Sequence, residues 1–335
     1  FCPQLLGRLL SYKEEYPRVK TLIEELRETG TKTCYLMPLS SCLDLGGPEI
    51  SRKIFDSHVL SLATRKSSTD SVVICGLENG SIIVFDLETG KEVQQLLGHQ
   101  GWVRCLGLSR SETILASGSL DKTAILWNMD SYEQLFVLQL KSPVRALDVS
   151  VDGQRLFTGS FDGYLSSFVA TGSRELLNST RAHDELVSSL CTTTDGQYVA
   201  TASRYDDSIK LWKADTLDFE ATLVGHTDGV RCVVATDSGK DNPMLVSASC
   251  DKTIKIWDLK TYQEIRTLVG HEGWVNSVAV SYDKKHIISG GNGRIVRLWC
   301  FHTGKLISCF EGHTDYISCV AILSDGLRAV SASDD

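Results

Sequence analysis

Long apolar runs, paired cysteines and an excess of positive charge are all missing from this sequence of 335 residues. No stretch approaches the roughly 18 consecutive apolar residues that a membrane span needs. No signal peptide is visible, because an arginine interrupts the first apolar stretch, FCPQLLGRLL. Lys and Arg number 34 against 42 Asp and Glu, a net charge of −8. This balance disfavours anionic membrane surfaces and nucleic acid, whose binding depends on neutralising phosphates.

The 11 cysteines are thinly spread, and no CxxC pair occurs among them. A disulfide scaffold needs dense cysteines in a short secreted chain, so we expect a reduced, cytoplasmic protein. No phosphate-binding glycine loop is present, since SGKD at 238–241 lacks the upstream glycine of that motif. We therefore expect no cofactor, and any nucleotide-binding domain would lie upstream. The chain opens on Phe1 and ends on SASDD, which suggests a piece of a longer protein.

A pattern of about 43 residues repeats along the chain. A β-branched residue opens a short apolar segment at positions 59, 103, 144, 187, 230, 275 and 317, as in VRCLGL and VNSVAV. An aromatic residue follows 24 to 27 positions later in six of these units: Phe85, Trp127, Phe168, Trp212, Trp257 and Trp299. Between the two lies a small-residue segment with a turn, such as LASGSLD.

These apolar runs of period two, separated by Gly, Asp, Asn and Ser, predict β-strands and tight turns. Each unit supplies about four strands, and a four-stranded sheet cannot bury both faces alone. A ring of such sheets can, which predicts an all-β propeller.

The repeat resembles the WD-repeat family, whose units begin near Gly-His and end near Trp-Asp. The matching dipeptides are Gly98-His99, Gly225-His226, Gly270-His271, Gly312-His313 and Trp257-Asp258. The resemblance covers residues from about 50 to the end and implies a seven-bladed propeller that binds other proteins.

The family pattern also implies a hydrogen-bonded tetrad of His, Ser or Thr, Asp and Trp in each regular blade. Because buried polar groups are costly when unpaired, such a tetrad would hold the turn to the strand. The histidine, aspartate and tryptophan candidates are His99, Asp121 and Trp127, then His183, Asp206 and Trp212, then His226, Asp251 and Trp257. The hydroxyl partner is Ser117 or Ser119, Thr201 or Ser203, and Ser247 or Ser249, respectively. The unit from 144 lacks the histidine, and Gly293 replaces the aspartate in the unit from 275.

Ring closure is expected to involve both ends of the chain. Asp335 stands where a turn aspartate belongs, so the last blade is predicted to be truncated, without its third strand. Residues 49–58 look like a fourth strand with no blade before it, and we expect them to join that last blade. Closure of this kind would remove exposed sheet edges.

The first 58 residues differ from the repeats. Val19, Leu22, Ile23 and Leu26 have helical spacing, which predicts a short α-helical lead-in over residues 1–35. A linker over 36–48 and the propeller over 49–335 follow. LLGRLL, PLSSCL and GGP before the propeller resemble the segment preceding the WD repeats of NACHT or NB-ARC signal-transduction ATPases. The alternative is an amphipathic helix packed on the propeller side.

One end of the ring is the candidate binding face, because exposed aromatics are enriched at interaction hot spots. The residues expected there flank the turn aspartates or follow the unit histidines: Trp102, Leu120, Phe161, Leu186, Tyr205, Trp274 and Tyr316. Arg104, Arg145 and Arg231 share one position in three units. They either line the central channel as a basic ring or form salt bridges to turn aspartates.

No convergent acid, base or nucleophile suggests an enzyme, and the histidines lie in different blades, too far apart to bind one metal ion. The first function hypothesis is the sensor or autoinhibitory propeller of a NACHT-type signalling ATPase. The second is a free-standing scaffold or a substrate receptor of a ubiquitin ligase. Both imply other proteins as partners.

Overall fold

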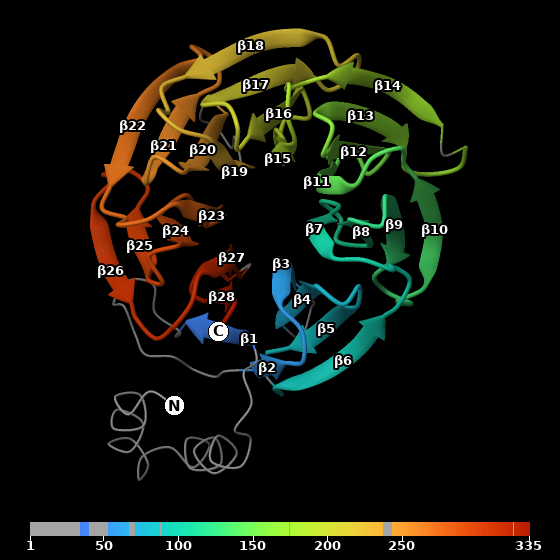
Figure 1. The fold of residues 1–335 in the computed structure, drawn as a ribbon, viewed down its shortest axis with the longest axis horizontal. Coiled ribbons are helices and arrows are strands. Elements are labelled where there is room, and N and C mark those ends of the chain that lie inside the picture. Colours follow the sequence, from blue (N-terminus) through green and yellow to red (C-terminus); the bar gives the residue numbers. More distant parts are fainter. Residues whose placement is uncertain are drawn as a thin grey trace.

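The computed structural model describes residues 34–39, 53–66, 71–87, 89–173, 175–236, 243–323 and 325–335. The described strands form four-stranded antiparallel sheets arranged around a central axis (Figure 1). Six of the sheets consist of four consecutive strands, and a seventh combines strands from both ends of the chain. The all-β propeller predicted from the sequence is confirmed.

The first to sixth blades take their strands in chain order, from the central channel to the rim (Figure 1). The first three are β3 Val59–Lys66, β4 Ser71–Leu77, β5 Ile82–Asp86 and β6 Lys91–Leu96; β7 Val103–Leu108, β8 Ile114–Ser119, β9 Thr123–Asn128 and β10 Gln134–Gln139; and β11 Val144–Val149, β12 Arg155–Ser160, β13 Tyr164–Val169 and β14 Leu176–Arg181. The next three are β15 Val187–Thr192, β16 Tyr198–Ser203, β17 Ser208–Lys213 and β18 Phe219–Val224; β19 Val230–Ala235, β20 Met244–Ser249, β21 Thr253–Asp258 and β22 Gln263–Val269; and β23 Val275–Val280, β24 His286–Gly291, β25 Val296–Cys300 and β26 Leu306–Phe310.

Strand position within a blade governs burial. The second strands are buried over most of their length and carry small residues near their ends, as in β8, ILASGS. A Cβ atom on Gly118 would lie only 2.5 Å from Val144 of the next blade, so a larger residue would push the two sheets apart. The outer strands alternate between exposed and covered residues because solvent reaches one of their faces, as in β10.

The hydrophobic core lies between neighbouring sheets. One buried cluster joins Ile74 and Val84 of the first blade to Leu115 and Trp127 of the second. Similar clusters fill the other interfaces around the ring. Each blade is therefore stabilised by its two neighbours, and the ring holds together only when every interface is filled.

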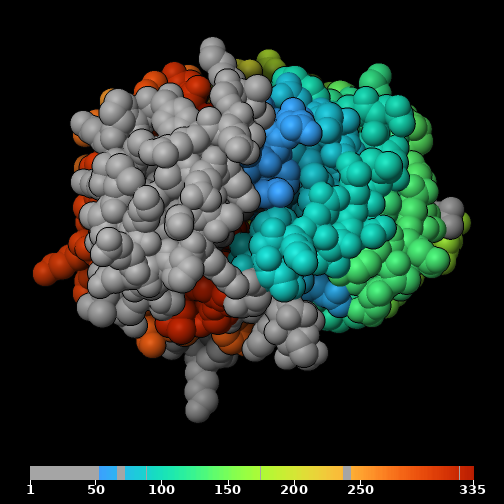
Figure 2. Space-filling model, turned by 90° about the horizontal axis from the view of Figure 1, so that it is seen from below, coloured from blue at the N-terminus to red at the C-terminus, as the bar shows by residue number. Residues whose placement is uncertain are grey.

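The seventh blade joins the two ends of the described chain. Its inner strands are β27 Ile317–Ile322 and β28 Ala329–Ser333, its third is β1 Cys34–Leu39, and its outermost is β2 Lys53–Phe55. β1 runs antiparallel to β28, with Met37 opposite Ser331. Seen from the side, blue residues of the early chain and red residues of the late chain lie on the same flank of the molecule (Figure 2).

This arrangement corrects one prediction and supports another. The third strand of the last blade is not missing, because β1 occupies its place. Ile317 and Val330, which a truncated blade would expose, are fully buried. The predicted fourth strand within 49–58 does join this blade as β2, and β1 crosses the expected boundary between lead-in and linker. The predicted helix over 1–35 lies outside the described residues apart from the start of β1.

Candidate functional site

One end of the ring carries the turns between second and third strands and the entries to the first strands. In the second blade, for example, Val103 at the start of β7 pairs with Ser119 at the end of β8. Trp102 and Leu120 therefore emerge at the same end, and the antiparallel order repeats this in each blade. We call this end the turn face. Its core is a set of histidine networks that attach the turns to the strands.

In the second blade, His99 lies 3.1 Å from Asp121 through Nδ1 and 2.8 Å from Ser117 through Nε2. Trp127 donates its Nε1–H to the same Ser117 oxygen at 2.8 Å. The fifth blade repeats this set. His226 lies 2.7 Å from both Asp251 and Ser247, and Trp257 donates to Ser247 at 2.8 Å. Of the two serines that the sequence left open in each blade, the first is the tetrad member.

The fourth blade uses a threonine in the same role. His183 lies 2.6 Å from Asp206 and 3.0 Å from Thr201, to which Trp212 donates at 2.9 Å. The extra residue in this turn does not disrupt the network. The seventh blade has the histidine part of the set, because His313 contacts Asp335 at 3.2 Å and Ser331 at 2.9 Å.

In the sixth blade an arginine takes the place of the missing aspartate. The sequence analysis did not predict this role. Arg297 donates from Nη1 to Nδ1 of His271 at 3.2 Å. Since arginine can only donate, Nδ1 of His271 must accept, and the ring proton lies on Nε2. That Nε2–H donates to Ser289 at 2.7 Å, and Trp299 donates to the same oxygen at 2.8 Å. The tautomer is thus opposite to the one in which Nδ1–H donates to a turn aspartate.

The protonation behaviour of these networks follows from their partners. Burial alone would raise the pKa of Asp121, but hydrogen bonds from Thr123 and Gln100 hold it below the usual value. Against the same effect of burial, the pKa of Asp251 is lowered by its hydrogen bonds to His226 and Thr253. Burial and the neighbouring Arg297 lower the pKa of His271 to about 3. The aspartates are therefore anionic and His271 is neutral at physiological pH.

Around these networks, aromatic side chains extend into solvent from the turn face. The exposed fractions are 61% for Tyr205, 46% for Tyr316, 41% for Trp102 and Trp274, and 36% for Phe161. Leu120 is half-buried. The prediction that Leu186 is exposed is wrong, since its exposed fraction is only 7%. Its side chain is smaller than those of Trp102 and Trp274 at the matching position, and it is covered where they remain exposed.

Arginine side chains gather where the turn face meets the central channel. Arg104, Arg145 and Arg231 are each the second residue of an inner strand, and Arg204 joins them from the turn after β16. All four are half-buried. The positive charges influence one another, since each of Arg104, Arg145 and Arg231 has its pKa lowered first by burial and also by neighbouring arginines. For Arg145 the pKa falls to about 10, so it remains charged at neutral pH.

The salt-bridge alternative for these arginines is wrong. Within the described ranges, no ion pair joins any of the four arginines to a carboxylate. Ion pairs of other arginines do occur there, as in Arg65–Asp130 and Arg155–Asp215. The reason is that the turn aspartates are already engaged by the tetrad histidines. The arginines therefore fit the other hypothesis, a basic ring that lines the channel.

The turn that carries Arg204 and Tyr205 depends on one glycine. A Cβ atom on Gly229 would lie 1.8 Å from the Arg204 carbonyl oxygen, a distance no side chain tolerates. Cys250, beside it, accepts a long contact of 3.9 Å from Arg231. A shallow depression lined by Arg204, Tyr205, Asp206 and Gly229 lies over this turn.

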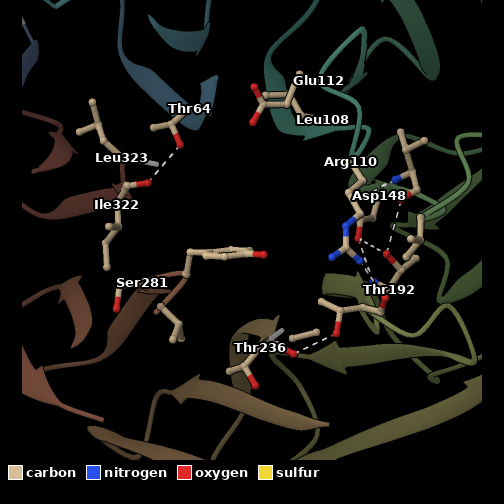
Figure 3. Close-up of a pocket in the computed structure, with 16 residues that line it drawn as sticks. Thr64, Leu108, Arg110, Glu112, Asp148, Thr192, Thr236, Ser281, Ile322 and Leu323 are labelled. Atoms are coloured by element: carbon tan, nitrogen blue, oxygen red, sulfur yellow. Dashed lines mark hydrogen bonds between the residues drawn. The ribbon is translucent and has the colours of Figure 1, made fainter. Parts of the chain in front are cut away.

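The opposite mouth of the channel forms a cavity of about 380 Å³ (Figure 3). Hydroxyl groups line it, and Asp148 accepts hydrogen bonds from the Thr192 amide and hydroxyl at 2.8 Å each. Burial raises the pKa of Asp148 in spite of these bonds. Tyr282, at this mouth, is 75% exposed. The cavity has fewer aromatic side chains than the turn face.

Within the described residues, no group of three or more His, Cys, Asp or Glu side chains could hold a metal ion. No helix long and apolar enough to cross a membrane occurs in the same part of the chain.

Comparison with known proteins identifies a matching family and several relatives. The family described as "WD domain, G-beta repeat" matches residues 90–128, 133–168, 174–213, 218–258, 262–300 and 304–335. "Periodic tryptophan protein 2" of Saccharomyces cerevisiae is 32% identical over 109 residues, which cover 32% of this chain and 12% of the yeast protein.

Two further relatives align over larger shares of this chain. "NACHT domain- and WD repeat-containing protein 1" of Mus musculus is 25% identical over 134 residues, 39% of this chain and 9% of the mouse protein. "Apoptotic protease-activating factor 1" of Rattus norvegicus is 26% identical over 226 residues, 65% of this chain and 18% of the rat protein. The chain thus matches less than a fifth of the length of each of these three relatives.

Proposed function

Because the chain belongs to the WD-repeat family, we propose that it is a protein-interaction module that binds a protein partner on its turn face. The observation that carries the proposal is the row of exposed aromatics on neighbouring blades: Trp102, Phe161 and Tyr205. Large exposed side chains on one rigid face bury much area at low entropic cost when a partner docks.

The turn face offers a rigid base for such contacts. The tetrads of the second, fourth and fifth blades tie the turns that bear Leu120 and Tyr205 to strands in the core. Trp102 and Trp274 stack on arginines, which fixes their ring planes. A face of this kind loses little conformational entropy on binding.

The finer proposal is that this propeller serves as the sensor or autoinhibitory module of a NACHT-type signalling ATPase in the cytoplasm. It is supported by the similarity to proteins whose names combine NACHT and WD repeats, and by the LLGRLL, PLSSCL and GGP segments within the first 48 residues. The coding sequence upstream of Phe1 tests it. A P-loop with its lysine is expected there; a coding sequence without one would favour a free-standing scaffold instead.

The binding face is tested by the double variant Phe161→Ala with Tyr205→Ala. A tagged chain is used to recover partners from cytosol, and affinity for the strongest partner is then measured. We expect a loss of about 2 kcal/mol or more, roughly 30-fold in affinity. Circular dichroism should be unchanged, because both side chains lie in turns and leave no core cavity.

The control is Tyr282→Ala, which removes a still more exposed aromatic from the opposite mouth. It should keep wild-type binding. If the double variant retains every partner while Tyr282→Ala loses them, the opposite mouth is the binding surface and the proposal for the turn face is wrong.

A further inference from the structure

The arginine cluster of the turn face lacks the anions that would normally neutralise it. Arg104, Arg145, Arg204 and Arg231 converge from the second to fifth blades without a carboxylate partner in the described ranges. The charge of Asp334 acts to raise the pKa of Arg104, and burial raises the pKa of that aspartate. Gathering four like charges at a half-buried site opposes folding, so the cluster calls for an explanation outside the fold.

Aromatic rings hold three of these guanidinium groups in place. Arg104 lies 5.5 Å from the Trp102 ring centroid, and Arg231 lies 5.2 Å from that of Trp274. Arg204 lies 5.3 Å from the Tyr205 ring. Stacking occupies a face of the guanidinium and leaves its N–H edge available, which is the edge that binds a carboxylate in a bidentate manner. Nε of Arg104 is buried and has no hydrogen-bond partner.

We propose that this arginine cluster binds the carboxylate of an aspartate or glutamate on a partner's peptide segment, inserted into the mouth of the channel. This inference rests on the function proposed above and specifies the chemistry of the partner. The aromatic residues beside the arginines would pack against the flanking residues of the same segment. Arg104 and Arg231 supply guanidinium groups that are oriented by stacking on aromatic rings. Arg145 supplies a further positive charge from the channel wall.

The charges around the cluster favour one carboxylate over a polyanion. Asp207 and Asp228 lie on the depression beside Arg204, and the whole chain carries a net charge of −8. These negative charges repel nucleic acid and disfavour a doubly charged phosphate more strongly than a single carboxylate. The site is positive only at its centre, which suits one acidic side chain surrounded by uncharged or basic neighbours.

The test begins with random twelve-residue peptides displayed on phage and selected against the full chain. Parallel selections use Arg104→Gln with Arg231→Gln, and the control Arg181→Gln on the outer strand β14. Wild type and control should enrich peptides with Asp or Glu at one fixed position, and the double variant should not. Melting temperatures establish that both variants are folded; the single variant Arg231→Gln replaces the double one if that does not fold.

Fluorescence anisotropy then measures the strongest peptide, its Glu→Gln or Asp→Asn form, and a phosphoserine form. Loss of the carboxylate should weaken binding about tenfold on wild type, as expected for a charged hydrogen-bonded pair. On the double arginine variant the same change should have an effect of about threefold or less, because the interacting groups are already gone. Such coupling would not arise from a general effect of charge.

Each remaining outcome would overturn the inference. Selected peptides without a fixed acid, but sensitive to Phe161→Ala with Tyr205→Ala, would leave the proposed binding face intact and remove only the arginine assignment. A phosphoserine form that binds tenfold more tightly than the acid would contradict the preference for a carboxylate. Peptides insensitive to both sets of variants, or no selected peptide at all, would count against the proposed face as well.

Discussion

At the level of single residues, each tetrad concentrates buried hydrogen bonds on one hydroxyl group. In the fifth blade, Ser247 contacts both His226 and Trp257 while His226 holds Asp251. All four side chains are almost fully buried. Removing one member leaves its partners without water to replace it, so a conservative change should have a measurable effect on stability.

We therefore expect Trp257→Phe to lower the free energy of unfolding by about 1–3 kcal/mol, because the Ser247 oxygen loses a donor in a buried site. Denaturant titration measures the change. The same substitution at Trp102, which is 41% exposed and outside any tetrad, is the control and should cost less than about 0.5 kcal/mol. Equal midpoints for the two variants would show that the tetrads do not stabilise the blades.

The sixth blade makes stability depend on pH in a range where few side chains titrate. His271 has a pKa of about 3 in the folded protein, below the value of about 6.5 expected in the unfolded chain. Below pH 6.5 the unfolded state therefore binds the proton and the folded state does not. Stability is complete above this pH and should fall by about 1.4 kcal/mol for each pH unit below it.

Replacing this histidine should flatten that dependence. His271→Gln is expected to be less stable than wild type at pH 7.5, and the difference between them should shrink as the pH is lowered to 5. Melting temperatures across this range provide the measurement. The control His302→Gln removes an exposed imidazole and should retain the wild-type profile. Parallel curves for His271→Gln and wild type would contradict the assignment of a neutral, buried imidazole.

The residues that sequence analysis placed correctly are those whose roles are local. The family pattern implied the tetrads correctly because one blade contains the histidine, the serine and the aspartate. Arg297 was missed because that pattern has an acid at the turn, whereas the arginine reaches His271 from β25. Leu186 was assigned to the surface by analogy of position, although its size allowed it to be covered.

At the level of elements, the strands were predictable and one pairing was not. Period-two patterns and turn residues marked the strands of the six consecutive blades, since their partners are neighbours in sequence. β1, with the sequence CYLMPL, carries no repeat signature and includes a proline. Its position was set by the open edge of β28 at the far end of the chain, which local patterns cannot reveal.

The role of β1 can be tested by shortening the chain. A form that begins at residue 50 lacks β1 and leaves β28 with an unpaired edge. We expect its melting temperature to fall by several degrees and its tendency to self-associate to rise, because such an edge is a template for another strand. Calorimetry and light scattering measure these changes.

A form that begins at residue 34 is the matched control, since it keeps β1 and should behave like the full chain. If the form that begins at residue 50 is as stable and as monomeric as this control, then β1 does not complete the seventh blade in solution. The truncated last blade predicted from the sequence would then be the better description.

At the level of the whole molecule, stability comes from a closed cycle of interfaces. Clusters between adjacent blades bury residues of both partners, and the last of them joins Val330 of the seventh blade to Val59 and Val73 of the first. Further bonds cross the same junction, as where Ser318 donates to the Val59 carbonyl at 2.7 Å. The turn face is rigid only while this junction is closed, so binding and ring closure should be lost together.

The pairing of β1 with β28 also bears on the order of events during folding. The first six blades consist of neighbouring segments, whereas Met37 and Ser331 are separated by nearly the entire chain. Closing a loop of roughly 300 residues costs on the order of 5 kcal/mol in chain entropy. We therefore expect the pairing of β1 with β28 to be a late step in folding. The same pairing should matter in unfolding: separation of β1 from β28, more than the unfolding of any one blade, should set the rate at which the ring opens.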